Sequence, residues 1–198
     1  MTKDRLLAFS DGVIAILITI MVLELDVPKG GHWSDLRDDL PVLLAYVVSF
    51  VYVGIYWTNH HHMLSIVHRV TGGALWANLH LLFWLSLVPF TTAWMSENDF
   101  QAAPVAAYGI DLLGCALAYF VLQGVLLRSE GPDSLLARAV GADRKGKASS
   151  VLCAGGIALT FVERWLGLAV YILVALLWFI PDRRVERTLA ASDERLAD

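Results

Sequence analysis

The first apolar stretch of the chain contains an acid that could do chemistry. Asp11 lies between Leu6 and Glu24, in a run whose other side chains are almost all apolar. If that run crosses a membrane, the carboxylate costs a few kcal/mol unless neighbouring side chains hydrogen bond to it. An acid in this position can hold a helix in place, ligate a metal or relay a proton.

Partners for Asp11 are available at the ends of the next two apolar stretches. If successive stretches run antiparallel, the side chains at its depth, besides Ser10, are Asn59, His60, Trp76, Asn78 and His80. We favour a hydrogen-bonded network that clamps the first helix, because polar groups commonly hold membrane helices together. A metal site or a proton relay stays open as an alternative. The consecutive histidines His60 to His62 point in three directions on a helix, so they cannot all bind one ion.

A second acid, Asp111, lies midway along the fourth apolar stretch, and its simplest role is a contact between helices. Together with Asp11 and the histidines His60 to His62, it makes a proton-coupled secondary transporter the main rival hypothesis. Against that rival, the chain has no pair of internal repeats and no matching helices broken by Gly or Pro. A structural membrane subunit without transport activity is a further alternative.

Enzymatic chemistry finds no support in the sequence. No nucleophile and base have a catalytic spacing, and no metal motif such as His-Glu-x-x-His is present. Cys115 and Cys153 both lie in apolar runs, where a buried thiol is an ordinary small hydrophobic side chain. We therefore expect no enzyme activity, no metal, no cofactor and no nucleic-acid partner.

The composition places these residues in an integral membrane protein. Hydrophobic residues make up 57% of the 198 and charged residues only 17%, whereas a soluble domain is about a quarter charged. Residues 40–68 and 70–96 contain no Asp, Glu, Lys or Arg, and each run exceeds the roughly 20 residues with which a helix crosses a lipid bilayer. Because the backbone must satisfy its own hydrogen bonds in lipid, the chain is predicted to be all-α.

Six membrane helices in one domain, residues 1–198, are predicted. The expected segments are residues 6–25, 40–60, 74–95, 103–127, 148–162 and 165–180. The last two segments are predicted to form a hairpin, because only Glu163 and Arg164 separate them and this leaves room for no more than a tight turn. The longest connection, residues 128–147, is expected to be a polar loop.

The positions of the basic residues predict that both termini are cytoplasmic. With the N-terminus inside and six crossings, 12 of the 15 Lys and Arg residues fall on the cytoplasmic side, in agreement with the bias of membrane proteins for positive charge inside. The outer loops then hold only Lys29, Arg37 and Arg164, and they are also acidic.

The first helix also carries an apolar stripe. Ile16, Ile20 and Leu23 recur at i, i+4 and i+7 and so share one face of the helix. A small-residue stripe suited to close helix packing lies beside it and consists of Gly12, Ala15 and Thr19. Taken alone, an isoleucine stripe in a membrane helix indicates packing against lipid or protein and no more.

The opening of the chain resembles a known family signature. The run Arg5-x-x-x-Phe9-Ser10-Asp11 resembles that of the transmembrane protein 175 family, the lysosomal potassium channels and their bacterial relatives. The run continues as Gly12-Val13-Ile14-Ala15-Ile16 and closes with Val22-Leu23-Glu24, and the second stretch ends in a familiar Trp57-x-Asn59-His60-His61. The length suits the bacterial form, which has one six-helix unit per chain.

The resemblance implies a potassium-permeable channel, with K+ as the permeant ion, that bacteria assemble as a homotetramer in the cell membrane. The family has no Thr-Val-Gly-Tyr-Gly filter, and this chain has none. Its central pore is lined by the first helix of each unit, with bulky aliphatic side chains at the narrow points. Counting from Asp11, the resemblance assigns the constrictions to Ile16, Ile20 and Leu23, and it assigns Thr19 to the layer associated with potassium preference. It implies that the remaining signature residues hold the pore helix to its neighbours: Arg5, Phe9, Ser10 and Asp11.

Overall fold

The computed structural model describes residues 2–37, 39–141 and 143–179. In that part of the chain all regular structure is helical, in seven elements. The helices are α1 (Lys3–Leu23), α2 (Leu40–Ser65), α3 (Gly72–Glu97), α4 (Ala102–Glu130), α5 (Leu135–Val140), α6 (Arg144–Thr160) and α7 (Arg164–Phe179).

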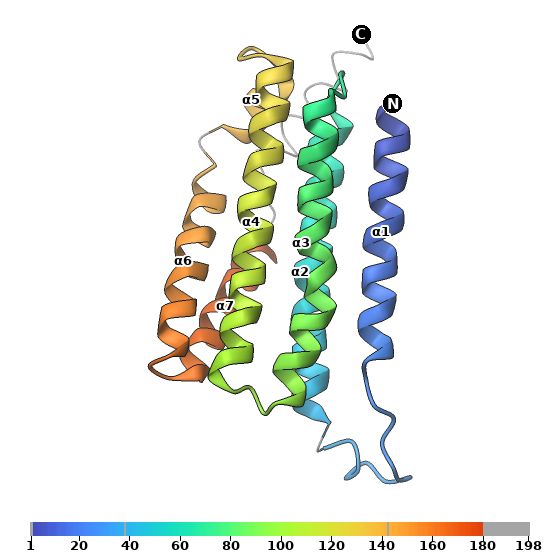
Figure 1. The fold of residues 1–198 in the computed structure, drawn as a ribbon, viewed down its shortest axis with the longest axis vertical. Helices are drawn as coiled ribbons and strands as arrows, with labels where there is room; N and C mark the ends of the chain where they lie inside the picture. Colours follow the sequence, from blue (N-terminus) through green and yellow to red (C-terminus); the bar gives the residue numbers. More distant parts are fainter. Residues whose placement is uncertain (1, 38, 142, 180–198) are drawn as a thin grey trace.

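The six longer helices run up and down along the long axis of the molecule (Figure 1). The start of α1, the end of α2, the start of α3 and the end of α4 all lie at one end, where the short α5 is also found. The turn between α6 and α7 lies at the opposite end. Each longer helix is therefore antiparallel to the longer helix before it.

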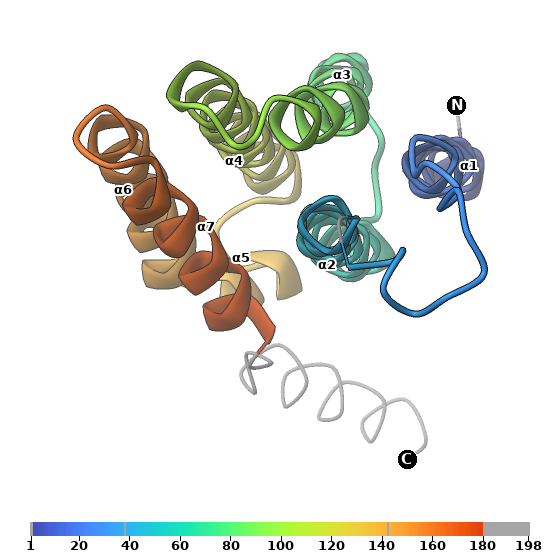
Figure 2. The same ribbon diagram turned by 90° about the horizontal axis from the view of Figure 1, so that it is seen from below.

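The helices form a bundle with α1 at one edge and α6 at the other (Figure 2). α1 packs against α2 and α3, whereas α6 packs against α4 and α7. Two apolar cores result. One lies among α1 to α4 and includes Leu81 and Leu85, and the other lies among α2, α4, α6 and α7 and includes Tyr108 and Tyr171. α2 contributes to both cores and joins the two halves of the bundle.

Glycines allow the outer helices to approach one another closely. A Cβ on Gly167 of α7 would overlap Thr160 Oγ1 of α6 and lie 3.0 Å from the carbonyl oxygen of Gly156. A Cβ on Gly114 of α4 would overlap the ring of Trp84 on α3. Small residues at such points let helix backbones pack tightly, which is how membrane helices commonly associate.

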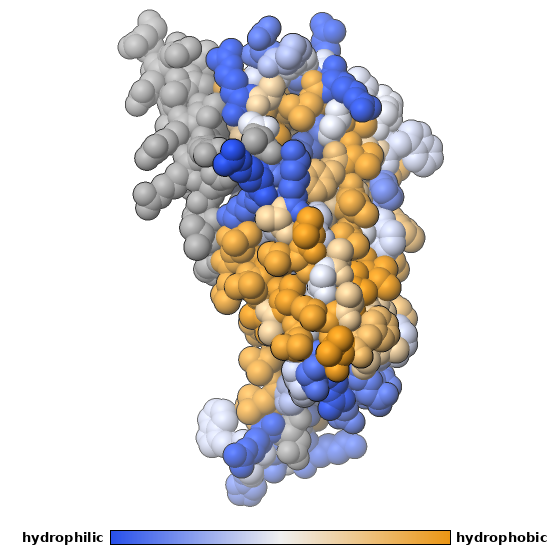
Figure 3. All heavy atoms as spheres, turned by 90° about the vertical axis from the view of Figure 1, so that its left-hand side faces the viewer, coloured by the Kyte–Doolittle hydropathy of each residue, from blue (hydrophilic) through white to orange (hydrophobic). Residues whose placement is uncertain are grey.

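The surface divides into an apolar band and two polar ends. The face in Figure 3 shows hydrophobic side chains across the middle and hydrophilic ones above and below. Four helices of the described part of the chain, α1 to α4, are long and apolar enough to cross a membrane. α7 is apolar from Arg164 to Trp178 but shorter, and α6 begins with a basic turn.

The observed helices overlap all six predicted segments, and their ends differ by a few residues. The connection predicted as a polar loop, residues 128–147, is largely helical: α4 continues to Glu130, α5 lies within the connection and α6 begins at Arg144. Its polar residues cap these helices, since Ser134 accepts a hydrogen bond from Ala137 N and Asp143 accepts one from Gly146 N. Such capping is a helix start signal, so polar residues in a connection do not by themselves indicate a loop. The end of the sixth predicted segment, residue 180, lies outside the described residues.

Candidate functional site

One face of α1 is buried and the opposite face is exposed. The buried face consists of Leu6, Ser10, Ile14, Leu17 and Met21, which recur at the spacing of one helix side. α2 and α3 cover this face. The helix is therefore attached to the bundle along one side only.

A polar chain of three side chains joins the first three helices near the start of this buried face. Asn78 of α3 donates a hydrogen bond from Nδ2 to Ser10 Oγ on α1 at 3.0 Å. His60 Nε2 on α2 donates to Asn78 Oδ1 at 2.6 Å. Ser10 passes the chain on to its own helix by donating to the carbonyl of Leu6. All three polar residues are fully buried, so each hydrogen bond spares the cost of burying an unpaired group.

Asp11 has a separate partner. The indole Nε1 of Trp57 on α2 donates to Asp11 Oδ1 at 2.9 Å. Ser10 and Asp11, neighbours in the sequence, are thus bonded to two different helices, α3 and α2. Two such attachments on one turn of α1 fix both its depth and its rotation. We name the hydrogen-bonded set Ser10, Asp11, Trp57, His60 and Asn78 the α1 clamp.

The other side chains predicted at this depth lie elsewhere. Asn59 donates to the carbonyl of Ile55 in its own helix, and its own carbonyl accepts from Tyr119. Trp76 is 76% exposed, and His80 accepts from Trp84 one turn along α3. None of these three side chains has a hydrogen bond to Asp11 among the described residues, although all three were expected at its depth.

The remaining signature residues, Arg5 and Phe9, are exposed on α1. The predicted constriction residues are exposed as well: Ile16 is 57% exposed, Ile20 39% and Leu23 79%. Thr19 lies on the same exposed face and donates to the carbonyl of Ile16. An apolar face on an edge helix is thus left without a partner in the described part of the chain.

A second buried polar cluster, in the other half of the bundle, was missed from the sequence except for Asp111. Thr91 of α3 donates to Asp111 Oδ2 at 2.9 Å. Ser49 of α2 is bonded to Thr92 and Tyr108. The signal that could have revealed the Thr91–Asp111 pair is a hydroxyl side chain on one apolar helix at the depth of an acid on the next. Such hydroxyls form hydrogen bonds between membrane helices.

The two acids have separate partners, and two of the three consecutive histidines are exposed. Asp11 and Asp111 bond to different helices, and His61 and His62 are exposed. Among the described residues no group of three or more His, Cys, Asp or Glu side chains is placed to hold a metal ion. The geometry of the site is therefore that of a helix held by hydrogen bonds beside an exposed apolar face.

Comparison with known proteins places this arrangement in a family. Residues 5–89, which include the whole clamp, match the model of a family described as the endosomal/lysosomal potassium channel TMEM175. A potassium channel of Chryseobacterium sp. (strain P1-3) is 52% identical over 189 residues, which make up 96% of this chain and 98% of that protein. The chain belongs to the TMEM175 family.

Further relatives agree with this placement. A potassium channel of Streptomyces collinus (strain DSM 40733 / Tue 365) is 41% identical over 135 residues, or 64% of this chain and 66% of that protein. The crystal structure of a lysosomal potassium-selective channel TMEM175 homologue from Chamaesiphon minutus matches with a TM-score of 0.79 at 29% identity. The match covers 90% of this chain and 96% of that chain.

Membership of the TMEM175 family confirms the resemblance seen in the run from Arg5 to Asp11. The family is one of channels and not of enzymes. With its long apolar helices, this family member is a multi-pass membrane protein of all-α fold.

Proposed function

We propose that this chain is one subunit of a potassium-permeable cation channel in a bacterial plasma membrane. The support from its relatives is that those from Chryseobacterium and Streptomyces are named potassium channels. The observation that carries the proposal is the exposed apolar face of α1, opposite a face that is hydrogen bonded into the bundle. A helix arranged in this way is suited to line a pore.

A pore requires several copies of the chain. One exposed stripe on one helix cannot enclose a channel, and closed cyclic symmetry is the usual way in which copies surround an axis. In our proposal four subunits place their α1 helices around a central axis. The exposed small residues Gly12 and Ala15 support close approach at that axis, since a Cβ on Gly12 would have nothing within 4 Å.

In the proposed topology, residues 1–198 form one transmembrane domain with six crossings, made by α1 to α4, α6 and α7, and both termini are cytoplasmic. The alternating direction of the six longer helices supports an even number of crossings (Figure 1). The basic residues at the end that holds the start of α1 support its cytoplasmic placement.

Within this channel, Ile16, Ile20 and Leu23 form the hydrophobic constriction and Thr19 contributes to potassium preference. Rings of aliphatic side chains can close a pore by dewetting, and hydroxyls can replace part of the hydration of an ion. All four side chains lie on the exposed side of α1. Asp11 and Ser10 are turned into the bundle, so we assign them a structural role, and we place Arg5 and Phe9 at contacts between subunits.

The rival function, a proton-coupled secondary transporter, needs Asp11, Asp111 and the His60 to His62 cluster to act together. Asp11 and Asp111 are bonded in different places and to different helices. Among the described residues, no continuous path of hydrogen bonds joins the two acids, and this favours the channel.

Planar-bilayer recording of the purified full chain tests the function. In symmetrical potassium chloride we expect unitary current steps, and under a potassium/sodium gradient we expect a reversal potential displaced toward that of potassium. Protein-free bilayers are the control. Saturable flux coupled to protons, with no unitary steps, would support the transporter, and electrically silent bilayers containing folded protein would support a structural subunit.

A further inference from the structure

Asp111 is a buried acid that neither the α1 clamp nor the proposed pore uses. It lies in α4, about 14 Å from the start of the helix at 1.5 Å per residue, and only 2% of its surface is exposed. Its Oδ2 lies 2.9 Å from Thr91 Oγ1 on α3. Its Oδ1 is buried and has no hydrogen-bond partner among the described residues. A buried carboxyl group with one bare oxygen requires a physical explanation.

No positive charge is paired with Asp111 in the part of the chain that the structure describes. α2 and α3 contain no Lys or Arg, and the Arg128 of α4 lies about 26 Å further along the helix at 1.5 Å per residue. The basic residues of α6 and α7 lie in the first turns of those helices. None of them forms an ion pair with Asp111. A buried carboxylate without a cation is costly in hydrocarbon.

The titratable groups around Asp111 cannot supply a positive charge either. On α4 itself, Tyr108 and Cys115 are close enough to interact with it electrostatically, and α3 faces it with the hydroxyl of Thr91, which does not titrate. The titratable side chains of α2, α4, α6 and α7 in this part of the bundle are all hydroxyls or thiols: Tyr52, Tyr56, Tyr108, Cys115, Cys153 and Tyr171. Such groups are neutral or negative, so they cannot balance a carboxylate.

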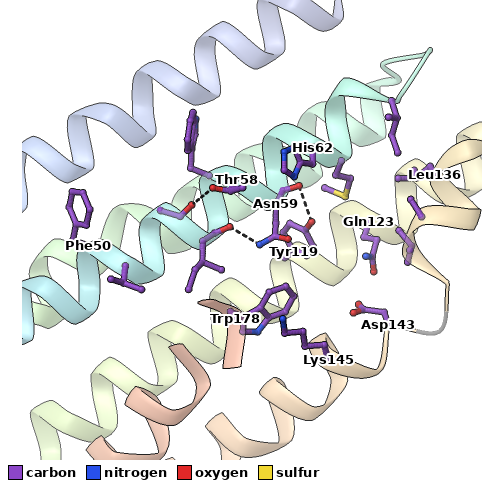
Figure 4. Close-up of a pocket in the computed structure, with 18 of the residues that line it drawn as sticks. Phe50, Thr58, Asn59, His62, Tyr119, Gln123, Leu136, Asp143, Lys145 and Trp178 are labelled. Atoms are coloured by element: carbon purple, nitrogen blue, oxygen red, sulfur yellow. Dashed lines mark hydrogen bonds between the residues drawn. The ribbon is translucent and has the colours of Figure 1, made fainter. Parts of the chain in front are cut away.

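The open recess of the bundle lies elsewhere. It measures about 670 Å3, follows α2 beside α4 and α6, and contains a different acid, Asp143 (Figure 4). Asp143 accepts a hydrogen bond from the backbone N–H of Gly146 at 3.1 Å. Asp111 lines neither this recess nor the neighbouring cavity of about 50 Å3. Water or a cation held in these two spaces therefore cannot balance a charge on Asp111.

The contacts of Thr91 account for a proton on Asp111. Thr91 Oγ1 lies 2.9 Å from Asp111 Oδ2 and 3.2 Å from the carbonyl oxygens of both Leu87 and Val88, but its hydroxyl has only one hydrogen. An ionised Asp111 takes that hydrogen and leaves none for either carbonyl. A neutral Asp111 donates its own hydrogen from Oδ2 to Thr91 Oγ1, and Thr91 then donates to a carbonyl of α3. The bare Oδ1 is then a neutral carbonyl oxygen, which costs far less to bury than a charged one.

We propose that Asp111 is a proton-binding site and that it is a neutral carboxylic acid in the folded protein at neutral pH. The proton lies between Asp111 Oδ2 and Thr91 Oγ1 and joins α4 to α3. α3 also carries Asn78 of the α1 clamp, so this contact stabilises the helix that holds α1. Loss of the proton places an unpaired charge between α3 and α4. The proposal does not depend on the conduction of ions.

Infrared spectroscopy of the purified full chain tests this proposal without any measurement of current. The C=O stretch of a protonated carboxyl group is separate from the bands of a carboxylate, and isotope-labelled aspartate identifies it by its shift. At neutral pH an exposed aspartate, which titrates near about pH 4, is ionised. We expect wild-type protein to show a protonated-aspartate band that Asp111→Asn lacks. Asp143→Asn is the matched control, because it removes the acid beside the recess and asparagine can also cap α6. A folded wild type without the band, or a band that Asp143→Asn removes and Asp111→Asn retains, would overturn the proposal.

Replacement of Thr91 gives a test that does not depend on the folding of Asp111→Asn. Thr91→Val keeps the branched shape of the side chain but removes the acceptor of the proton, so the band should shift in frequency while remaining that of a protonated acid. Thr92→Val is the matched control, because Thr92 is a buried neighbour whose hydroxyl bonds to Ser49 and not to Asp111, and it should leave the band in place. A band that Thr91→Val does not move, or that both substitutions move equally, contradicts a proton shared by Asp111 and Thr91.

Discussion

The indole N–H of Trp57 on α2 donates a hydrogen bond to the carboxylate of Asp11 on α1 across 2.9 Å. The residue before Asp11, Ser10, is bonded to Asn78 on α3. These two bonds hold α1 in one rotation relative to the bundle. That rotation leaves the side of α1 with Ile16 and Leu23 exposed.

Replacement of Asp11 should damage assembly and leave ion preference unchanged. Asp11→Ala removes the hydrogen bond from Trp57, whose side chain is 44% exposed, at a cost of about 1 kcal/mol. We expect a lower yield of folded oligomer and a lower Tm in detergent, with Asp11→Asn partly restoring both because its amide oxygen can still accept. A normal yield of Asp11→Ala oligomer with a shifted potassium/sodium permeability ratio would show that the carboxylate acts on the ion.

Asn78 should be more important for stability than its polar neighbours on the surface of α3. It accepts from His60 and donates to Ser10. Asn78→Ala therefore leaves the buried His60 ring without a hydrogen-bond partner, at about 1–3 kcal/mol, and removes one of the two hydrogen bonds of Ser10, which keeps its bond to the carbonyl of Leu6. Thermal unfolding in detergent should show a clear fall in Tm. Asn98→Ala is the control, because Asn98 bonds only locally, to Trp94 at the end of α3. Equal effects of the two substitutions would argue against the clamp.

Polar substitution of the exposed stripe of α1 should raise conductance. Ile16→Asn and Ile20→Asn place an amide where the proposed pore is narrowest, and a hydrated ring removes the barrier caused by dewetting. Unitary currents in planar bilayers should be larger than in wild type, with weaker discrimination between potassium and sodium. Val151→Asn, at a site on α6 that is 72% exposed, is the control. Wild-type currents in both isoleucine variants would remove these residues from the pore.

The protein should be a homotetramer in mild detergent. One pore-lining helix per chain needs copies to close a ring around an axis. The mass of the protein in the protein–detergent complex, measured by light scattering with correction for bound detergent, should be four times the chain mass of 21.8 kDa. A monomer that still conducts is incompatible with the model.

The α6–α7 hairpin should depend on Gly167. A Cβ there would overlap Thr160, and overpacking a tight contact typically costs about 1–3 kcal/mol. Gly167→Ala should therefore lower the Tm in detergent. Gly124→Ala in α4 has open space for its Cβ and should be neutral or slightly stabilising, because alanine favours helix by about 1 kcal/mol over glycine. If both variants melt at the wild-type temperature, the close packing of α6 on α7 is not required for stability.

The sequence by itself determined the class of fold and the family. Long runs without charge, such as residues 40–68, leave a helix as the only way to satisfy the backbone in lipid. The signature from Arg5 to Asp11 indicated the family that the comparisons then confirmed. The depth of polar residues could also be read from their position along each run, and this brought Ser10, His60 and Asn78 to one level.

The tertiary structure decided which side chains at that level meet. Trp57 bonds to Asp11, whereas Asn59, Trp76 and His80 bond or point elsewhere. A sequence reports distance along the membrane normal, but the choice of partner depends on how each helix is rotated and which helix lies beside it. Those are set by packing of whole faces, including close approaches such as that of Gly114 to Trp84.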